Sequence, residues 1–212
     1  RNYPDPLNGL HPDSGLQTNP VYQPETQAFL AFERTRNFVL AANYHGGAEV
    51  VNFPWDTYPT TGGANIHPHD NYFKYISTEY ASLCQTADGN NLYMDDVFGT
   101  GQFPGTTNGS AWYTVAGGRQ DYNNYFNHSK EITIEVSATK FPAATTLPTF
   151  WNNNRQAILN YVKQANYGLH GIVSDATGNP IHAKVYINGY DLKGSWVETS
   201  ATKGDYHKVL VA

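Results

Sequence analysis

The chain has 212 residues with a formal net charge of −5, and 15% of its residues are charged while 14% are aromatic. The low charged fraction and the 16 tyrosines argue against a disordered chain, because aromatic side chains of this abundance pack a core. The sequence has no cluster of Lys and Arg and no run of about 18 apolar residues, which argues against a nucleic-acid partner and against a membrane span. The single Cys84 cannot form an internal disulfide, and scarce cysteine beside abundant Tyr, Asn and Thr favours an extracytoplasmic setting, secreted or periplasmic.

The first half of the chain is predicted to alternate loops, helices and strands. Residues 1–25 are rich in Pro, Asn, Asp and Gly and favour loops, whereas residues 25–36 favour a helix. Residues 38–44 form a near-continuous apolar run, which predicts a strand that is covered on both faces and ends at His45. Asp70 is expected to cap a helix that extends to about Cys84. The following stretch to Asn127 is rich in Gly and Asn and is predicted mostly as loop.

The second half changes character near Gly168. Residues 131–136 alternate as a strand does, with isoleucines on the apolar face and Glu135 on the opposite, more accessible face. Residues 148–162 predict a helix whose packed side carries Trp151, Ile158, Leu159 and Val162. After Gly168, short β-prone runs at 170–173, 184–187 and 206–211 indicate an all-β module. We therefore predict one domain over residues 1–167 and the beginning of a β-sandwich over residues 168–212, cut off at Ala212.

Four blocks of the sequence resemble, in order, the M14 zinc metallocarboxypeptidases. They span residues 1–5, 43–56, 112–122 and 131–137, and they are most similar to the regulatory branch that contains carboxypeptidases N, E and D. The resemblance implies an α/β fold with a mixed sheet and helices on both sides, present as its later part, followed by a partial transthyretin-like sandwich. It also implies zinc as the cofactor and hydrolysis of the C-terminal peptide bond of a peptide or protein substrate.

The resemblance assigns catalytic and metal-binding roles to particular residues. His45 matches the third zinc ligand, and Gly46 and Gly47 beside it would let a substrate backbone approach closely. Glu135 matches the general base, and Tyr113 matches the tyrosine that closes over the bound peptide. From the residues alone, His45 could equally be a satisfied or exposed side chain. Likewise Glu135 could be an exposed strand residue, and Tyr113 could serve packing.

The resemblance also assigns residues that bind the substrate. Arg1 matches the arginine that grips the free α-carboxylate, because a guanidinium offers a bidentate fork. Asp56 matches the residue that selects C-terminal Lys or Arg, and Gln120 matches another wall of that pocket. The ordinary alternative for Asp56 is a turn cap. Trp55 and Arg119 depart from the commoner family residues near this pocket, which leaves its shape open.

The family's first two zinc ligands, a His-x-x-Glu motif, and its oxyanion-stabilising arginine are not found before Arg1. We expect the missing N-terminal part of the same enzyme to supply them, and we expect this chain alone to be inactive. The stretch from His128 to Glu131 fits His-x-x-Glu, but residues three apart in a strand point to opposite faces, so it is not expected to bind one metal. His67 and His69 are expected in a solvated loop before a helix, with an adventitious metal site as the alternative. The alternative function is a non-catalytic peptide-binding or scaffold member of the same fold.

Overall fold

The computed structural model describes residues 3–4, 22–57, 64–99 and 103–211. Its centre is a four-stranded mixed sheet in the order β1-β4-β2-β3. The strands are β1 Leu40–His45, β4 Lys130–Ser137, β2 Ala48–Phe53 and β3 Thr106–Asn108. β1 runs parallel to β4, β2 runs antiparallel to β4, and β3 runs parallel to β2. The predicted mixed α/β architecture is therefore present.

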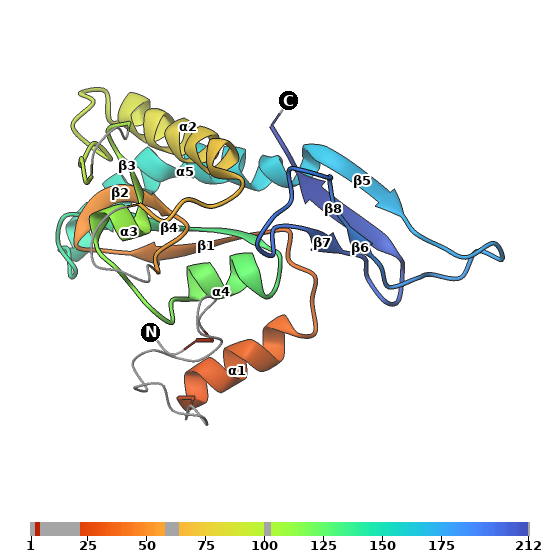
Figure 1. The fold of residues 1–212 in the computed structure, drawn as a ribbon. Coiled ribbons are helices and arrows are strands. Elements are labelled where there is room, and N and C mark those ends of the chain that lie inside the picture. The colour runs from red at the N-terminus through yellow and green to blue at the C-terminus, as the bar shows by residue number, and fades with distance from the viewer. Residues whose placement is uncertain (1–2, 5–21, 58–63, 100–102, 212) are drawn as a thin grey trace.

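Helices cover both faces of the sheet (Figure 1). The long helices α2 and α5 pack against each other on one side, and α1 and α4 lie on the other. The helices are α1 Pro24–Glu33, α2 Asp70–Asp88, α3 Gly109–Trp112, α4 Arg119–Tyr125 and α5 Leu147–Lys163, with 3-10 turns η2 Ala144–Thr146 and η3 Gln164–Asn166. This double cover explains why β4 is buried almost throughout.

The burial of β4 corrects the prediction for Glu135. Ile132 and Ile134 belong to the apolar core with α2, as the alternation predicts. Glu135 was expected on a more accessible face, but it is only 7% exposed, and Glu131 on the same face is fully buried. The reason is α4, which packs on that face and which the sequence pattern did not predict. A short polar helix lacks the apolar periodicity that marks longer helices.

The first strand is less buried than its apolar run predicts. In β1 the residues are half-buried or exposed, and Tyr44 keeps 48% of its surface accessible. Within the described residues β1 pairs with β4 alone and lies at the edge of the sheet. An edge position explains the difference, since a central strand would be covered on both sides.

The sequence correctly predicts that both long helices exist, but the end of α2 and the packed face of α5 differ from the prediction. Helix α2 continues past Cys84 to Asp88 and ends at Gly89, whose φ of 79° is the left-handed conformation that glycine adopts readily. Asp70 is its first residue and pairs with Lys74 at 2.7 Å rather than capping the helix.

The predicted packed side of α5 is correct for Ile158, which packs against the core, and wrong for the other three residues. Trp151, Leu159 and Val162 are exposed, and the buried face carries Asn153, Asn154, Ala157 and Tyr161. Asn154 donates to the Tyr93 hydroxyl at 2.6 Å and accepts from the Tyr80 hydroxyl at 2.9 Å. A buried amide is stable there because it is hydrogen-bonded, which an apolar pattern cannot reveal.

Residues 168–211, all of which the structure describes, contain strands and turns. β5 Gly168–Ile172 pairs antiparallel with β8 Asp205–Val209, and β6 Lys184–Val185 pairs antiparallel with β7 Val197–Glu198. We call this part the C-terminal β-region; it lies beside the sheet near the start of α2 (Figure 1). Its assignment to a separate transthyretin-like domain stays a prediction.

Candidate functional site

His45 and Glu135 are neighbours at one end of the sheet. They are register partners in the parallel pair of β1 and β4, each near the carboxyl end of its strand. His45 Nδ1 lies 3.5 Å from Glu135 Oε1, with the imidazole 56% exposed and the carboxylate side chain 10% exposed. Glu135 Oε2 is buried without a hydrogen-bond partner among the described residues. An accessible imidazole thus stands beside a carboxylate that has an unsatisfied oxygen.

Gly46 and Gly47 form the tight turn from β1 into β2. Gly47 has a φ of 129°, and its N–H donates to Ser137 O at 2.7 Å. A Cβ on Gly46 would lie 3.1 Å from Thr139 O. The turn itself therefore favours glycine at both positions, in addition to any contact with substrate.

A buried network that the sequence did not predict holds this end of the sheet together. Glu131 is fully buried and accepts hydrogen bonds from Arg119 Nε at 2.8 Å, from Asn43 Nδ2 and from Asn123 Nδ2. Arg119 also donates to Ala42 O at 3.2 Å. Burial raises the pKa of Glu131, and the three donors counteract that rise. The network joins β1, β4 and α4, so it fixes the strand that carries His45 against the strand that carries Glu135.

Asp56 and Gln120 form a second cluster, just after β2. Both are buried, and Gln120 Nε2 donates to Asp56 Oδ1 at 2.9 Å. A Cβ on Gly109 would lie 1.8 Å from Asp56 Oδ1, so the carboxylate occupies the space that a larger residue would fill. Gln120 Oε1 is buried without a partner among the described residues.

Asp121 is a positioning residue that the sequence did not predict. Its carboxylate accepts the backbone N–H of Asp56 at 2.9 Å and that of Thr57 at 2.9 Å. Asp121 therefore fixes the backbone at Asp56 and Thr57. The signal was present, since Asp121 follows Gln120 directly in the same block of sequence.

Tyr113 and Arg1 complete the predicted residues. Tyr113 follows α3, is 46% exposed and lies edge-on to Trp112 with ring centroids 4.8 Å apart. The same segment approaches Asp56, because Val115 N–H donates to Asp56 O at 2.9 Å. Arg1 lies outside the described residues. The structure thus brings His45 together with Glu135, and Asp56 together with Gln120, as two separate clusters.

Two histidine-containing stretches have other surroundings. The His128 ring bonds Gly194 O at 2.7 Å, whereas Glu131 faces Arg119, so the two do not share a metal. The expected solvated loop at His67 and His69 is wrong, since each is 1% exposed. They are buried because the C-terminal β-region packs over them, as the Asp191 contact with His69 at 2.8 Å shows.

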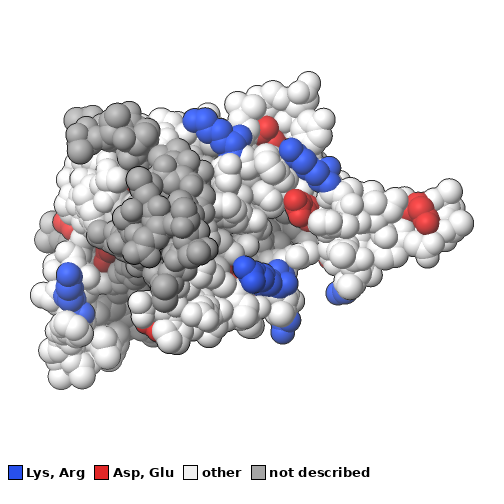
Figure 2. Space-filling view, turned by 60° about the horizontal axis from the view of Figure 1, so that its bottom comes forward, with Lys and Arg blue, Asp and Glu red and all other residues white. Residues whose placement is uncertain are grey.

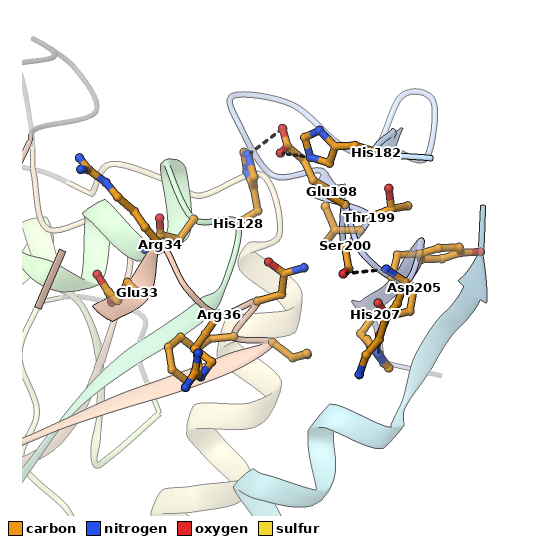
Figure 3. Close-up of a pocket in the computed structure, with 18 of the residues that line it drawn as sticks. Glu33, Arg34, Arg36, His128, His182, Glu198, Thr199, Ser200, Asp205 and His207 are labelled. Atoms are coloured by element: carbon orange, nitrogen blue, oxygen red, sulfur yellow. Dashed lines mark hydrogen bonds and ion pairs between the residues drawn. The ribbon is translucent and has the colours of Figure 1, made fainter. Parts of the chain in front are cut away.

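A cavity of about 700 Å³ lies between the end of α1 and the C-terminal β-region, and Figure 3 shows its lining residues. It is lined by residues 33–39, the end of α4 and part of the C-terminal β-region, including His128, His182 and Glu198. His182 and His128 both face Glu198, at 3.1 and 3.8 Å. The cavity lining includes none of the predicted site residues His45, Glu135, Asp56 and Gln120. The cavity is therefore not part of the candidate active site.

The imidazole of His45 suits zinc, which binds imidazole nitrogen, and the Glu135 carboxylate lies beside it. The described residues hold no group of three or more His, Cys, Asp or Glu that could bind a metal ion. His45 therefore fits one position of a zinc site, and the further ligands would come from outside the described residues.

Two features of the described surface bear on membrane and phosphate binding. In the described part of the chain, no helix is both long and apolar enough to traverse a bilayer. On the face shown in Figure 2, Lys and Arg side chains are scattered and interspersed with Asp and Glu. That face therefore carries no continuous basic patch of described residues for phosphate binding.

Comparisons with known proteins point to one family of enzymes. A family model described as zinc carboxypeptidase matches residues 1–157. Carboxypeptidase D of Drosophila melanogaster is 35% identical over 214 residues, which cover 99% of this chain and 14% of that protein. Carboxypeptidase M of Mus musculus is 35% identical over 210 residues, covering 97% of this chain and 46% of that protein. Carboxypeptidase E of Caenorhabditis elegans is 36% identical over 208 residues, covering 93% of this chain and 44% of that protein.

The chain spans less than half the length of each of these relatives. The family match includes all the predicted site residues, from Arg1 to Glu135. Zinc is the cofactor that this match implies. The resemblance seen in the four sequence blocks is thus confirmed, and the chain belongs to the zinc carboxypeptidase family.

Proposed function

We propose that the protein containing this chain is a metallocarboxypeptidase that removes the last residue of a peptide or protein, with a preference for Lys or Arg. The observation that carries the proposal is the contact between His45 Nδ1 and Glu135 Oε1 at 3.5 Å, at the ends of two paired parallel strands. Family membership supplies the reaction class. We also propose an extracytoplasmic setting, on the basis of a composition poor in Cys and rich in Tyr, Asn and Thr.

His45 would be one ligand of the zinc ion, with the other ligands provided by a preceding part of a longer protein. When bound, the ion supplies Lewis-acid polarisation of the scissile carbonyl and makes water more acidic. The exposure of the imidazole, 56%, leaves it accessible to an ion from the solvent side. Because one ligand of three holds zinc weakly, we expect this chain by itself to be inactive.

Glu135 would act as the general base and later as the general acid. Its Oε2, buried without a partner among the described residues, is the atom we assign to accept a proton from the attacking water. The same carboxyl would then return that proton to the nitrogen of the leaving amino acid. Burial excludes competing water, and the Glu131 network keeps β1 and β4 aligned during both transfers.

Substrate recognition would involve the second cluster. Asp56 would pair with the cationic end of a C-terminal Lys or Arg, while Gln120 orients its carboxylate through the bond to Oδ1. An apolar side chain would leave this buried carboxylate without that cation, which disfavours such substrates. Arg1 would grip the free α-carboxylate, Tyr113 would close over the peptide, and the turn at Gly46 and Gly47 would let the substrate backbone approach.

The test uses the longer protein, loaded with zinc, and two peptides that differ only in a C-terminal Arg or Leu. We expect faster release of Arg than of Leu. Glu135→Gln should lower kcat about 10²- to 10⁴-fold on both peptides. Glu25→Gln, at an exposed position on α1, is the matched control and should change nothing.

Asp56→Asn separates specificity from catalysis in the same assay. It should reduce kcat/KM for the Arg peptide by at least about 10-fold and should affect the Leu peptide much less, because a charged hydrogen-bonded pair is lost. Equal losses on both peptides would contradict the assigned pocket. Zinc-loaded protein that releases neither residue would contradict the enzymatic function and would favour a binding or scaffold role.

A further inference from the structure

The loop between β6 and β7, residues 186–196, packs against His69, just before α2, and against Tyr125 on α4. Its Asp191 side chain is fully buried. Asp191 Oδ1 lies 2.8 Å from His69 Nε2 and 2.5 Å from Lys208 Nζ, and Oδ2 accepts from Ile187 N–H at 2.5 Å. A buried carboxylate with these partners is held in one position. Asp191 therefore fixes the position of the His69 ring.

His69 is connected to Trp55 through His67. The ring of Tyr190 stacks on His69 with centroids 4.2 Å apart. The backbone N–H of His69 donates to His67 Nδ1 at 2.8 Å. The centroid of the His67 ring lies 4.7 Å from that of the Trp55 ring. His67, His69 and Trp55 are each at most 4% exposed. The row of packed rings ends at Trp55, which directly precedes Asp56, the proposed specificity residue.

A second contact reaches Trp55 from the same loop. Gly194 packs so closely on Tyr125 that an added Cβ would lie 3.1 Å from its ring carbon Cδ2. Tyr125 in turn lies edge-on to Trp55, with centroids 6.1 Å apart. The hydrogen bond between His128 Nδ1 and Gly194 O, at 2.7 Å, fixes the loop at this point.

Electrostatics keep the first contact in one protonation state. Burial, with Lys130 and Lys208 nearby, lowers the pKa of His69 to about 3. The ring is therefore neutral near neutral pH and donates Nε2–H to Asp191, while Lys208 balances the carboxylate charge. Burial also lowers the pKa of His67 well below its usual value, so neither imidazole gains a proton near neutral pH.

We propose that Asp191 and Gly194 are positioning residues for the Asp56 pocket, so that the C-terminal β-region sets the selectivity for the C-terminal residue of the substrate. The proposal rests on the function proposed above and deepens it. Two separate contacts from one loop converge on Trp55, and the backbone of Trp55 and Asp56 continues into the pocket. A displacement of Trp55 would move the Asp56 carboxylate relative to the substrate cation.

Two glycines of the loop provide a matched test. Gly194 and Gly189 have φ values of 81° and 77°, so replacement by Ala strains the backbone equally at both. An added Cβ at Gly194 meets Tyr125, whereas nothing lies within 4 Å of an added Cβ at Gly189. In the zinc-loaded longer protein, Gly194→Ala should lower the Arg-over-Leu ratio of kcat/KM on the order of 10-fold. Gly189→Ala should leave that ratio unchanged at a similar unfolding temperature.

Asp191→Asn tests the other contact, and it should lower the same ratio mainly by raising KM for the Arg peptide. A merely structural role would reduce activity on both peptides in parallel with the unfolding temperature. An Arg-over-Leu ratio in Gly194→Ala and Asp191→Asn equal to that of Gly189→Ala would overturn the proposal.

Amide hydrogen exchange provides a readout that needs no activity. The N–H groups of Asp56 and Thr57 donate to Asp121, so displacement of the segment should speed their exchange. We expect faster exchange at these amides in Gly194→Ala and Asp191→Asn than in Gly189→Ala. Wild-type protein that cleaves neither peptide would contradict the proposed function instead. In that case unchanged exchange in Gly194→Ala would overturn the positioning role, and faster exchange would support it.

Discussion

Replacing Arg119 by Met removes the cation that faces the Glu131 carboxylate and keeps most of the side-chain volume. Glu131 is fully buried, and its bond to Arg119 Nε is 2.8 Å long. The variant leaves the carboxylate with the amides of Asn43 and Asn123 as its remaining donors. Leaving a buried charge uncompensated costs about 3–5 kcal/mol. Because the Arg119 side chain is 23% exposed, we expect a loss near the lower end, about 3 kcal/mol.

The loss should depend on pH in a defined direction. Burial already raises the pKa of Glu131 in the folded protein, and removal of Arg119 raises it further. A group whose folded pKa exceeds its unfolded value favours folding at low pH, and this contribution is lost as the pH rises through the folded pKa. The destabilisation by Arg119→Met should therefore be smaller at about pH 5 than at about pH 8.

Urea unfolding of four proteins at both pH values measures this directly. The proteins are the wild type, Arg119→Met, Glu131→Gln and the double variant, which together give the coupling free energy. A coupling below about 0.5 kcal/mol, or a loss that is larger at the lower pH, would refute the reasoning. Because the network aligns β1 with β4, Arg119→Met should also lower kcat on both peptides.

Three further outcomes are expected. Tyr113→Phe should lower kcat/KM about 10-fold through a lost hydrogen bond to substrate, with little change in unfolding temperature because the ring is 46% exposed. Burial lowers the pKa of Lys130 to about 7, against 10.5 in the unfolded chain. The buried lysine therefore imposes no penalty on folding above pH 10.5, and the penalty grows as the pH falls from 10.5 to 7. Lys130→Met should accordingly be more stable than wild type at neutral pH, and the difference in unfolding free energy should close toward the unfolded pKa. Tyr161→Phe should cost about 1 kcal/mol in urea unfolding, since the hydroxyl bonds Ala41 O at 2.7 Å between α5 and β1.

Apolar patterns predict the elements of this fold better than they predict its buried polar contacts. The runs around residues 38–44 and 131–136 correspond to β1 and β4, because apolar periodicity depends on local sequence. Their parallel pairing joins residues about 90 positions apart, such as His45 and Glu135, and no local pattern contains that register.

The buried polar residues share one physical cause. The sequence reading treated polar side chains as exposed, which is correct for most of them. Glu131, Asn154 and His69 are buried nonetheless, because partners distant in the sequence satisfy their hydrogen bonds. The same cause explains the wrong face of α5, since its buried side includes two asparagines. A pattern read along one segment cannot include a partner that another segment provides.

The two buried polar networks act on different parts of the candidate site. The Glu131 network joins β1, β4 and α4, so a defect there should move His45 relative to Glu135 and slow every substrate. The Asp191 contacts reach Trp55 and Asp56 from the C-terminal β-region, so a defect there should change selectivity first. Catalytic groups must be held within about 0.5 Å of their productive places, and directional hydrogen bonds hold a position more tightly than apolar packing alone. Arg119→Met and Gly194→Ala should therefore separate kcat from the Arg-over-Leu ratio, and variants that change both equally would mean that the networks form one cooperative unit.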